Sequence, residues 1–196
     1  MAKIARIKHA RQFADLPTPR HSAVIDEITN EAQSDRAVAI IGAAYFDLVL
    51  RDIIAAKLLP DAELMRTLFE DRGPLQDFGA RIHLAYALRL FGRAAYDDLR
   101  VIKNIRNAFA HSAEAMDFNQ PDVTRSCGSL CYPQMISVRN QPDPHTSRQE
   151  YLRAIELLTE IFLEDQMRQD RGMSREPLIM ATGPRPSSGA RKTVKK

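Results

Sequence analysis

Apolar residues recur with helical spacing along almost all of this 196-residue sequence, and no segment sustains the alternation of a strand. The stretch over residues 35–59 is apolar nearly all round a helix, which is typical of a helix in the middle of a bundle. A chain of this length with 44% hydrophobic residues can bury one core. The pattern therefore predicts an all-α fold, a single-domain bundle of about six to eight helices.

Capping residues and breakers indicate where these helices begin and end. Thr18-Pro19 begins the first helix, and Ser34 caps the long apolar one. Gly92 stands in the usual stop position, and Ser147 with Glu150 forms a capping box ahead of the last helix. The expected helices cover residues 18–28, 35–59, 61–69, 78–91, 97–112, 121–130 and 147–169, and residues 131–145, which contain three prolines, are expected to form a loop.

The net charge of +3 is unevenly distributed along the chain. Residues 1–14 carry four cations and no acid, and residues 173–196 carry six cations against Glu176 alone, so the residues between them carry about −6. A domain that reads nucleic acid should have its basic patch on the folded part. We therefore expect a basic N-terminal arm over 1–17, a helical domain over 18–172, and a disordered basic tail over the remaining residues that can touch nucleic acid non-specifically.

The sequence shows neither a targeting signal nor a complete set of metal ligands. The sequence has no apolar run of about eighteen residues and no apolar segment after its N-terminal cations, so we expect a cytoplasmic protein without membrane contact. Cys127 and Cys131 are then expected as reduced thiols. Their C-x3-C spacing, with only a distant His145, lacks a fourth zinc ligand, so neither a metal nor a cofactor is expected.

The residues best suited to chemistry are Arg106, Asn107 and His111, which place a cation, an amide and a titratable base within one and a half helical turns. On a straight helix His111 lies about 140° away from Arg106, on the side of Asn107. Arg106 and His111 can therefore meet on one ligand only if the helix ends or kinks between them, or if a two-fold dimer apposes two copies. The apolar sector of this helix, with Arg106 at its edge, contains Leu99, Ile102, Ile105 and Phe109.

Each of these residues also has a purely structural interpretation. A guanidinium at the edge of a core needs a counter-charge, because an unpaired buried charge costs several kcal/mol. Asp52 is the candidate for a structural ion pair with Arg106, whereas Asp47 can pair locally with Arg51. His111 at a helix end can interact with the C-terminal dipole or hydrogen-bond a neighbour.

The spacing from Arg106 through Asn107 to His111 resembles the R-x(4-6)-H signature of HEPN domains, small helical bundles that are often dimeric and in many cases are metal-independent ribonucleases. The resemblance implies that His111 would act in acid–base chemistry on the RNA 2′-hydroxyl and that Arg106 would steady the phosphate. Asn107 would be the polar residue that follows the arginine. The three would be catalytic residues only if the chain is a ribonuclease.

Five stretches in about residues 30–131 form a second pattern: Ser34-Asp35-Arg36, AAYFDLVLRDII, GPLQDFGARIHLAYALRLFG, DLRVIKNIRNAFAHS and DFNQPDV. In this order they resemble the mannitol-operon repressor (MtlR-like) family of bacterial all-helical regulators. The resemblance implies a non-enzymatic transcriptional regulator that lacks a helix-turn-helix and works through a protein partner or as a homodimer. The apolar helices also lack a basic recognition face. The regulator and the ribonuclease remain two open hypotheses.

Overall fold

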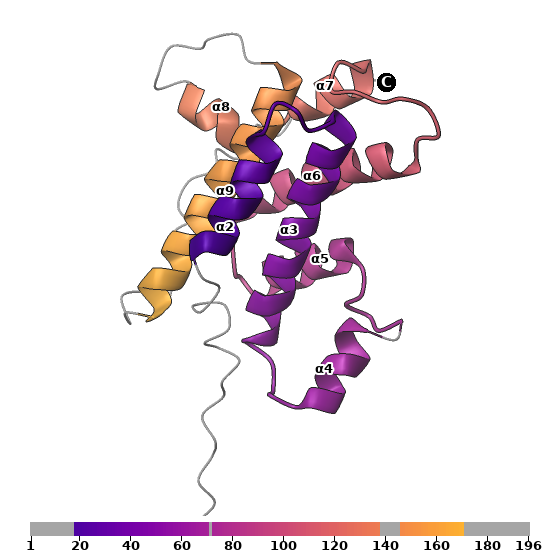
Figure 1. Cartoon of the computed structure of the whole chain (residues 1–196). Coiled ribbons are helices and arrows are strands. Elements are labelled where there is room, and N and C mark those ends of the chain that lie inside the picture. The colour runs from indigo at the N-terminus through magenta and orange to yellow at the C-terminus, as the bar shows by residue number, and fades with distance from the viewer. Residues whose placement is uncertain (1–17, 71, 138–145, 171–196) are drawn as a thin grey trace, which may run out of the picture.

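The computed structural model describes residues 18–70, 72–137 and 146–170, and these residues form eight α-helices and no strand (Figure 1). The prediction of an all-α bundle is confirmed. The helices are α2 (Thr18–Thr29), α3 (Asp35–Ala55), α4 (Ala62–Phe69), α5 (Phe78–Ala87), α6 (Arg93–His111), α7 (Pro121–Cys127), α8 (Cys131–Ser137) and α9 (Ser147–Asp170).

α3 is the central helix of the bundle. It packs against α2, α5, α6 and α9 (Figure 1), and its buried residues occur along its length, as its apolar character predicts. α3 and α9 approach closely at Gly42, because a Cβ atom there would lie 3.3 Å from Cδ1 of Ile155. Tyr151 connects the same two helices, since its hydroxyl donates to the carbonyl oxygen of Ala39 at 2.9 Å.

α4 lies at the edge of the bundle and is anchored by its last residue (Figure 1). Phe69 is 4% exposed, and the guanidinium carbons of Arg51 and Arg81 lie 5.9 and 5.6 Å from the centroid of its ring. The buried Arg81 donates to Oδ1 of Asp47 at 2.7 Å, and Arg51 pairs with Glu70 at 3.2 Å. Asp47 and Arg51 thus each bind a partner from outside α3 instead of one another.

The connection between α5 and α6 differs from the expected one. α5 ends at Ala87, and Arg89 then takes a left-handed conformation with φ of 56°. Gly92 is not the stop of α5, because it lies at the N-cap of α6 with φ of −85°. α6 therefore begins at Arg93, four residues before the expected start.

α8 corrects the expectation of a continuous loop after Cys131. Residues 131–137 are helical, and Pro133 is the third residue of this helix. A proline is tolerated there because the first N–H groups of a helix have no partner within it. The other residues of the expected loop, 138–145, lie outside the described residues.

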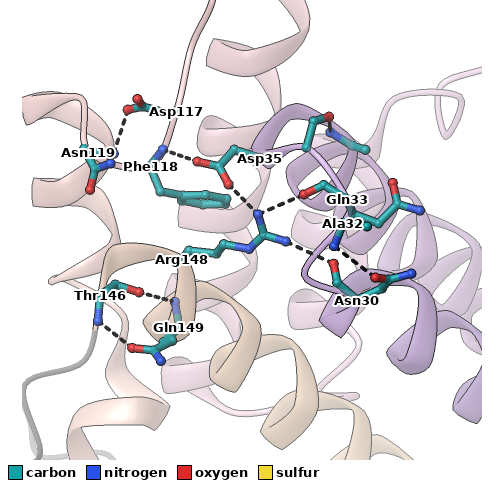
Figure 2. Close-up of polar contacts among 12 residues, drawn as sticks. Asn30, Ala32, Gln33, Asp35, Asp117, Phe118, Asn119, Thr146, Arg148 and Gln149 are labelled. Carbon is teal, nitrogen blue, oxygen red and sulfur yellow. Dashed lines mark hydrogen bonds and ion pairs between the residues drawn. The ribbon is translucent and has the colours of Figure 1, made fainter.

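The capping box of α9 lies one residue earlier than expected. The backbone N–H of Thr146 donates to Oε1 of Gln149 at 2.8 Å, and the backbone N–H of Gln149 donates to Oγ1 of Thr146 at 3.3 Å (Figure 2). The predicted box of Ser147 and Glu150 is wrong, because Ser147 is already helical and its hydroxyl contacts Oγ1 of Thr124 at 3.2 Å.

Candidate functional site

α6 carries the residues that were predicted to suit chemistry, and its apolar side faces the core. The helix runs without a break from Arg93 to His111 and packs against α3, α5 and α8. The predicted apolar sector is confirmed, because these residues are at most 2% exposed: Leu99, Ile102, Ile105 and Phe109.

Arg106 and His111 lie on different sides of α6. Five helical residues turn the chain through about 500°, so the two side chains leave the axis about 140° apart. Arg106 is half-buried, whereas His111 is exposed at the last position of the helix. Because α6 is continuous between them, the two side chains do not converge within one chain. Asn107, which is half-buried, lies on the His111 side.

The positive charge of Arg106 affects the pKa of one residue on α3 and one on α9. Burial raises the pKa of the Asp47 carboxyl, and the positive charges of Arg81 and Arg106 oppose that rise. Burial also raises the pKa of Tyr151, again against the charge of Arg106. Asp47 is thus an acidic neighbour of Arg106, and the ion pair between Arg106 and Asp52 stays a prediction.

The C-terminal end of α6 receives a guanidinium from α3. Arg36 donates through Nη2 to the carbonyl oxygens of Ser112 and Glu114, each at 2.9 Å. Ser112 is the C-cap of α6, and the last carbonyls of a helix lack partners within it and carry partial negative charge, so a cation is favourable there. Arg36 therefore stabilises the end of the helix that presents His111. The predicted interaction of His111 with the same dipole stays a prediction.

A second polar network lies beside this end and is built around Asp35 and Arg148 (Figure 2). Arg148, on α9, donates to Oδ1 of Asp35 at 2.7 Å and to the carbonyl oxygens of Gln33 at 2.9 Å and Asn30 at 3.3 Å. The other oxygen of Asp35 accepts the backbone N–H of Phe118 at 2.9 Å. We call these contacts the Asp35–Arg148 network. It joins the start of α3, the start of α9 and the segment before α7.

Some residues in and beside this network belong to the stretches that resemble the family. Asp35 and Arg36 belong to one of the five resembling stretches and Phe118 belongs to another, and the structure brings these stretches together. Arg148 was missed, because it is 113 residues from Asp35 and looks like an ordinary charge in the first turn of a helix. The polar side chains beside His111 thus bind mainly backbone carbonyl and N–H groups, and they hold together the segments to which those groups belong.

Asp98 is a buried carboxylate on α6. It is 0% exposed, and it accepts the backbone N–H groups of Cys131 at 2.6 Å and Tyr132 at 3.0 Å. These are the first two N–H groups of α8, so Asp98 caps that helix from α6. Burial raises the pKa of Asp98, and the two backbone hydrogen bonds oppose the rise. Its neighbour Asp97 is partly exposed and pairs with Arg93 at 2.7 Å.

An exposed cluster of aromatic and basic residues surrounds Tyr96. The Tyr96 hydroxyl lies 2.8 Å from Nδ1 of His83, and its ring stacks on Tyr86 with centroids 4.4 Å apart. The guanidinium carbons of Arg93 and Arg100 each lie 5.4 Å from the Tyr96 ring centroid. The cluster therefore fixes two cations against one aromatic ring at the N-terminal half of α6.

The two cysteines are free thiols, as expected. Burial raises the pKa of both Cys127 and Cys131 to about 12, so neither is a thiolate nucleophile at neutral pH. Among the described residues, no three His, Cys, Asp or Glu side chains are grouped so as to hold a metal ion. His145 lies outside the described residues. No described helix combines the length and apolar character that a membrane span requires.

Comparison with known proteins gives one family and one fold. The sequence model of a family described as MtlR, Mannitol repressor, matches residues 62–182, which is more than half of the chain. A chain in the X-ray structure of the MtlR-HPr complex from Escherichia coli is 18% identical and superposes with a TM-score of 0.53. The match covers 72% of the present chain and 98% of that chain, and at this identity it shows a shared fold. No curated protein matches the chain.

Proposed function

The chain belongs to the mannitol repressor family, and on that basis we propose that it is a non-enzymatic bacterial transcriptional regulator that acts through a protein partner. The observation that carries the proposal is the family match over residues 62–182. The divergence of Arg106 and His111 on an unbroken helix supports a binding role over catalysis within one chain. The high pKa of the cysteine thiols also argues against covalent catalysis by them.

The partner that we propose is a protein of the HPr kind. The solved chain that shares this fold belongs to a complex of MtlR with HPr, and the match includes 98% of that chain. Nearly every element that could meet the partner there therefore has a counterpart in the present fold. A shared fold does not by itself transfer a function, so binding has to be measured.

Isothermal titration of the full-length protein with HPr tests the partner. We expect saturable binding in the micromolar range or tighter, as for other regulatory protein complexes of ordinary interface size. An absence of heat and of co-elution with HPr would contradict the proposed partner. The regulatory role has its own test, in which transcripts of the mannitol operon are quantified with and without the gene. We expect them to increase without it, and unchanged transcripts would contradict the role.

The HEPN-type ribonuclease remains the second candidate, because the exposed His111 is accessible and a two-fold dimer could place it opposite the partner's copy of the motif. The test is RNA cleavage in the presence of EDTA by wild type, His111→Ala and the control His83→Ala, which changes another exposed histidine. A ribonuclease should lose activity in His111→Ala and retain it in His83→Ala. Equal activity in all three proteins, or none in any, excludes catalysis by His111.

A further inference from the structure

The solvent-facing side of α6 is basic, although the chain between its two basic ends carries about −6. On this side α6 presents three cations, Arg93, Arg100 and Lys103, against one carboxylate, Asp97. The other acid of the helix, Asp98, is fully buried, and both of its oxygens accept N–H groups of α8. This side of α6 therefore has an excess of positive charge, whereas the chain between its two basic ends has an excess of negative charge.

The side chains of this face follow one line along the helix. At about 100° per residue they project within a sector of about 100°, and they extend over about 27 Å of the helix axis. All of them are exposed or half-exposed. We call this surface the basic face of α6, and it consists of Arg93, Arg100, Lys103, Asn104, Asn107 and His111.

Two of the cations contact the same aromatic ring in the free protein. Arg93 and Arg100 are seven residues apart, and both guanidinium groups lie 5.4 Å from the centroid of the Tyr96 ring. Tyr96 is itself positioned by His83 and by stacking on Tyr86. A long side chain that is ordered in the free protein loses less conformational entropy when it binds. The basic face is thus partly preorganised to bind anions.

We propose that the basic face of α6 binds the phosphate backbone of duplex DNA. Arginine, lysine, asparagine and histidine side chains can all donate hydrogen bonds to phosphate oxygens, and a row about 27 Å long can meet several phosphates of one duplex. The proposal goes beyond a regulator that works through a protein partner, because it assigns a direct and sequence-independent DNA contact to the folded part of the chain. It also replaces the expectation that the helices lack a basic face.

The composition of the basic face favours DNA over the other macromolecules. Protein interfaces have an apolar centre, whereas the basic face consists of cations, amides and one histidine. Protein–DNA interfaces are more polar and much more positive. Single-stranded RNA is commonly bound by stacking on open aromatic rings. The Tyr96 ring already contacts Tyr86 and two guanidinium groups, which leaves it poorly placed to stack a base.

Asp97 gives the proposal an unusual test. Its carboxylate lies 2.7 Å from Nε of Arg93 and 4.0 Å from Nη1 of Arg100, so it competes with phosphate for both cations. Asp97→Asn removes that competing charge. If the basic face binds DNA, this variant should bind more tightly than wild type.

The experiment measures fluorescence anisotropy of a labelled duplex with the full-length protein, in which both basic termini are retained, over a series of salt concentrations. The variants are Arg100→Ala, Asp97→Asn and the control Arg125→Ala, which removes an equal charge from the exposed Arg125–Asp122 pair on α7. Arg100→Ala should raise Kd roughly three- to tenfold and reduce the salt slope by about 1. Asp97→Asn should lower Kd, and Arg125→Ala should leave both values unchanged.

Three results would overturn the proposal. Equal losses in Arg100→Ala and Arg125→Ala would mean that only overall charge or the basic termini bind the duplex. An Asp97→Asn variant that binds no more tightly than wild type would remove the basic face from the contact. Competition by single-stranded RNA or by HPr at lower concentration than duplex DNA would assign the basic face to that other partner. Circular dichroism melting of each variant confirms that the proteins compared are folded.

Discussion

The two ends of α6 are fixed to the rest of the bundle by opposite kinds of polar contact. Near the N-terminal end, the fully buried Asp98 carboxylate accepts two backbone N–H groups of α8. At the C-terminal end, Arg36 donates to two carbonyl oxygens, and Arg148 pairs with Asp35 beside them. None of the ion pairs between described residues includes Asp98. One end thus depends on a single buried anion and the other on a shared network.

This difference determines how each end responds when one side chain is lost. Removal of Asp98 leaves the N–H of Tyr132 without an acceptor in a buried place and that of Cys131 in a partly buried one, and an unsatisfied buried donor carries its full desolvation cost. The side chains of Arg148 and Asp35 are 24% and 20% exposed, so water can replace part of a lost contact there. We therefore expect substitution of Asp98 to lower the free energy of unfolding more than substitution of a single residue in the Asp35–Arg148 network.

The largest expected effect comes from Asp98→Ala. The substitution removes the cap of α8, leaves the N–H groups of Cys131 and Tyr132 without their acceptor and opens a small cavity, so we expect the free energy of unfolding to fall by about 2–4 kcal/mol. Urea denaturation followed by circular dichroism measures this change. Asp97→Ala is the matched control, and it should change the free energy by less than about 1 kcal/mol because Asp97 is partly exposed. Equal losses of unfolding free energy in Asp98→Ala and Asp97→Ala would contradict the special role of the buried carboxylate.

A smaller loss is expected from Arg148→Ala. The variant removes the ion pair with Asp35 and the donors to Gln33 and Asn30, but Asp35 keeps the N–H of Phe118. We expect the free energy of unfolding to fall by about 1–2 kcal/mol.

The control for Arg148→Ala is Arg125→Ala, whose ion pair has side-chain exposures of 77% and 90% and should contribute less than about 0.5 kcal/mol. Both variants are measured by the same urea denaturation. A loss in Arg148→Ala greater than that in Asp98→Ala would reverse the predicted order of the two ends.

The pH dependence of stability separates the acceptor role of Asp98 from its charge. Burial raises the pKa of Asp98 in the folded protein above its unfolded value near 3.9, so the folded state binds the proton more tightly. The contribution of Asp98 should be greatest below that unfolded value and should decrease as pH rises through the higher folded-state pKa.

Asp98→Asn removes the titrating group and isolates this effect. The stability of wild type relative to Asp98→Asn, measured by urea denaturation at a series of pH values upward from about 4, should therefore fall with increasing pH. A rise with pH would mean that the two amide hydrogen bonds outweigh burial and lower the pKa instead.

Local signals in the sequence were sufficient for most of the fold. The helical periodicity and the Ser34 cap predicted α3, and the same periodicity placed Leu99 to Phe109 against the core. The angular argument also predicted that Arg106 and His111 diverge on a straight helix, and α6 is continuous there. These features depend on residues within a few turns of one another, so the sequence displays them directly.

The features that sequence analysis missed depend on distant partners. α8 was assigned to a loop because of the prolines in residues 131–145, and the carboxylate that caps it, Asp98, lies 33 residues before it. Arg148 gave no signal because the carboxylate that it binds is 113 residues away. The candidate site was therefore predictable as a set of residues on α6, whereas the contacts that fix its two ends were not.

The smallest expected effect concerns the cap of α9, where two overlapping patterns compete. Thr146-x-x-Gln149 and Ser147-x-x-Glu150 both fit a capping box, and the second was the one predicted from the sequence. The hydrogen bonds select the first pair, so Thr146→Ala should lower the free energy of unfolding by about 1 kcal/mol. Ser147→Ala should lower it by less than about 0.5 kcal/mol, because it loses only an exposed contact with Thr124. Both variants are compared by urea denaturation, and the reverse order would mean that Ser147 is the cap.

Because α9 supplies Arg148, a weakened cap should also loosen the C-terminal end of α6 and leave the Asp98 end unchanged. Amide hydrogen exchange can measure this helix by helix.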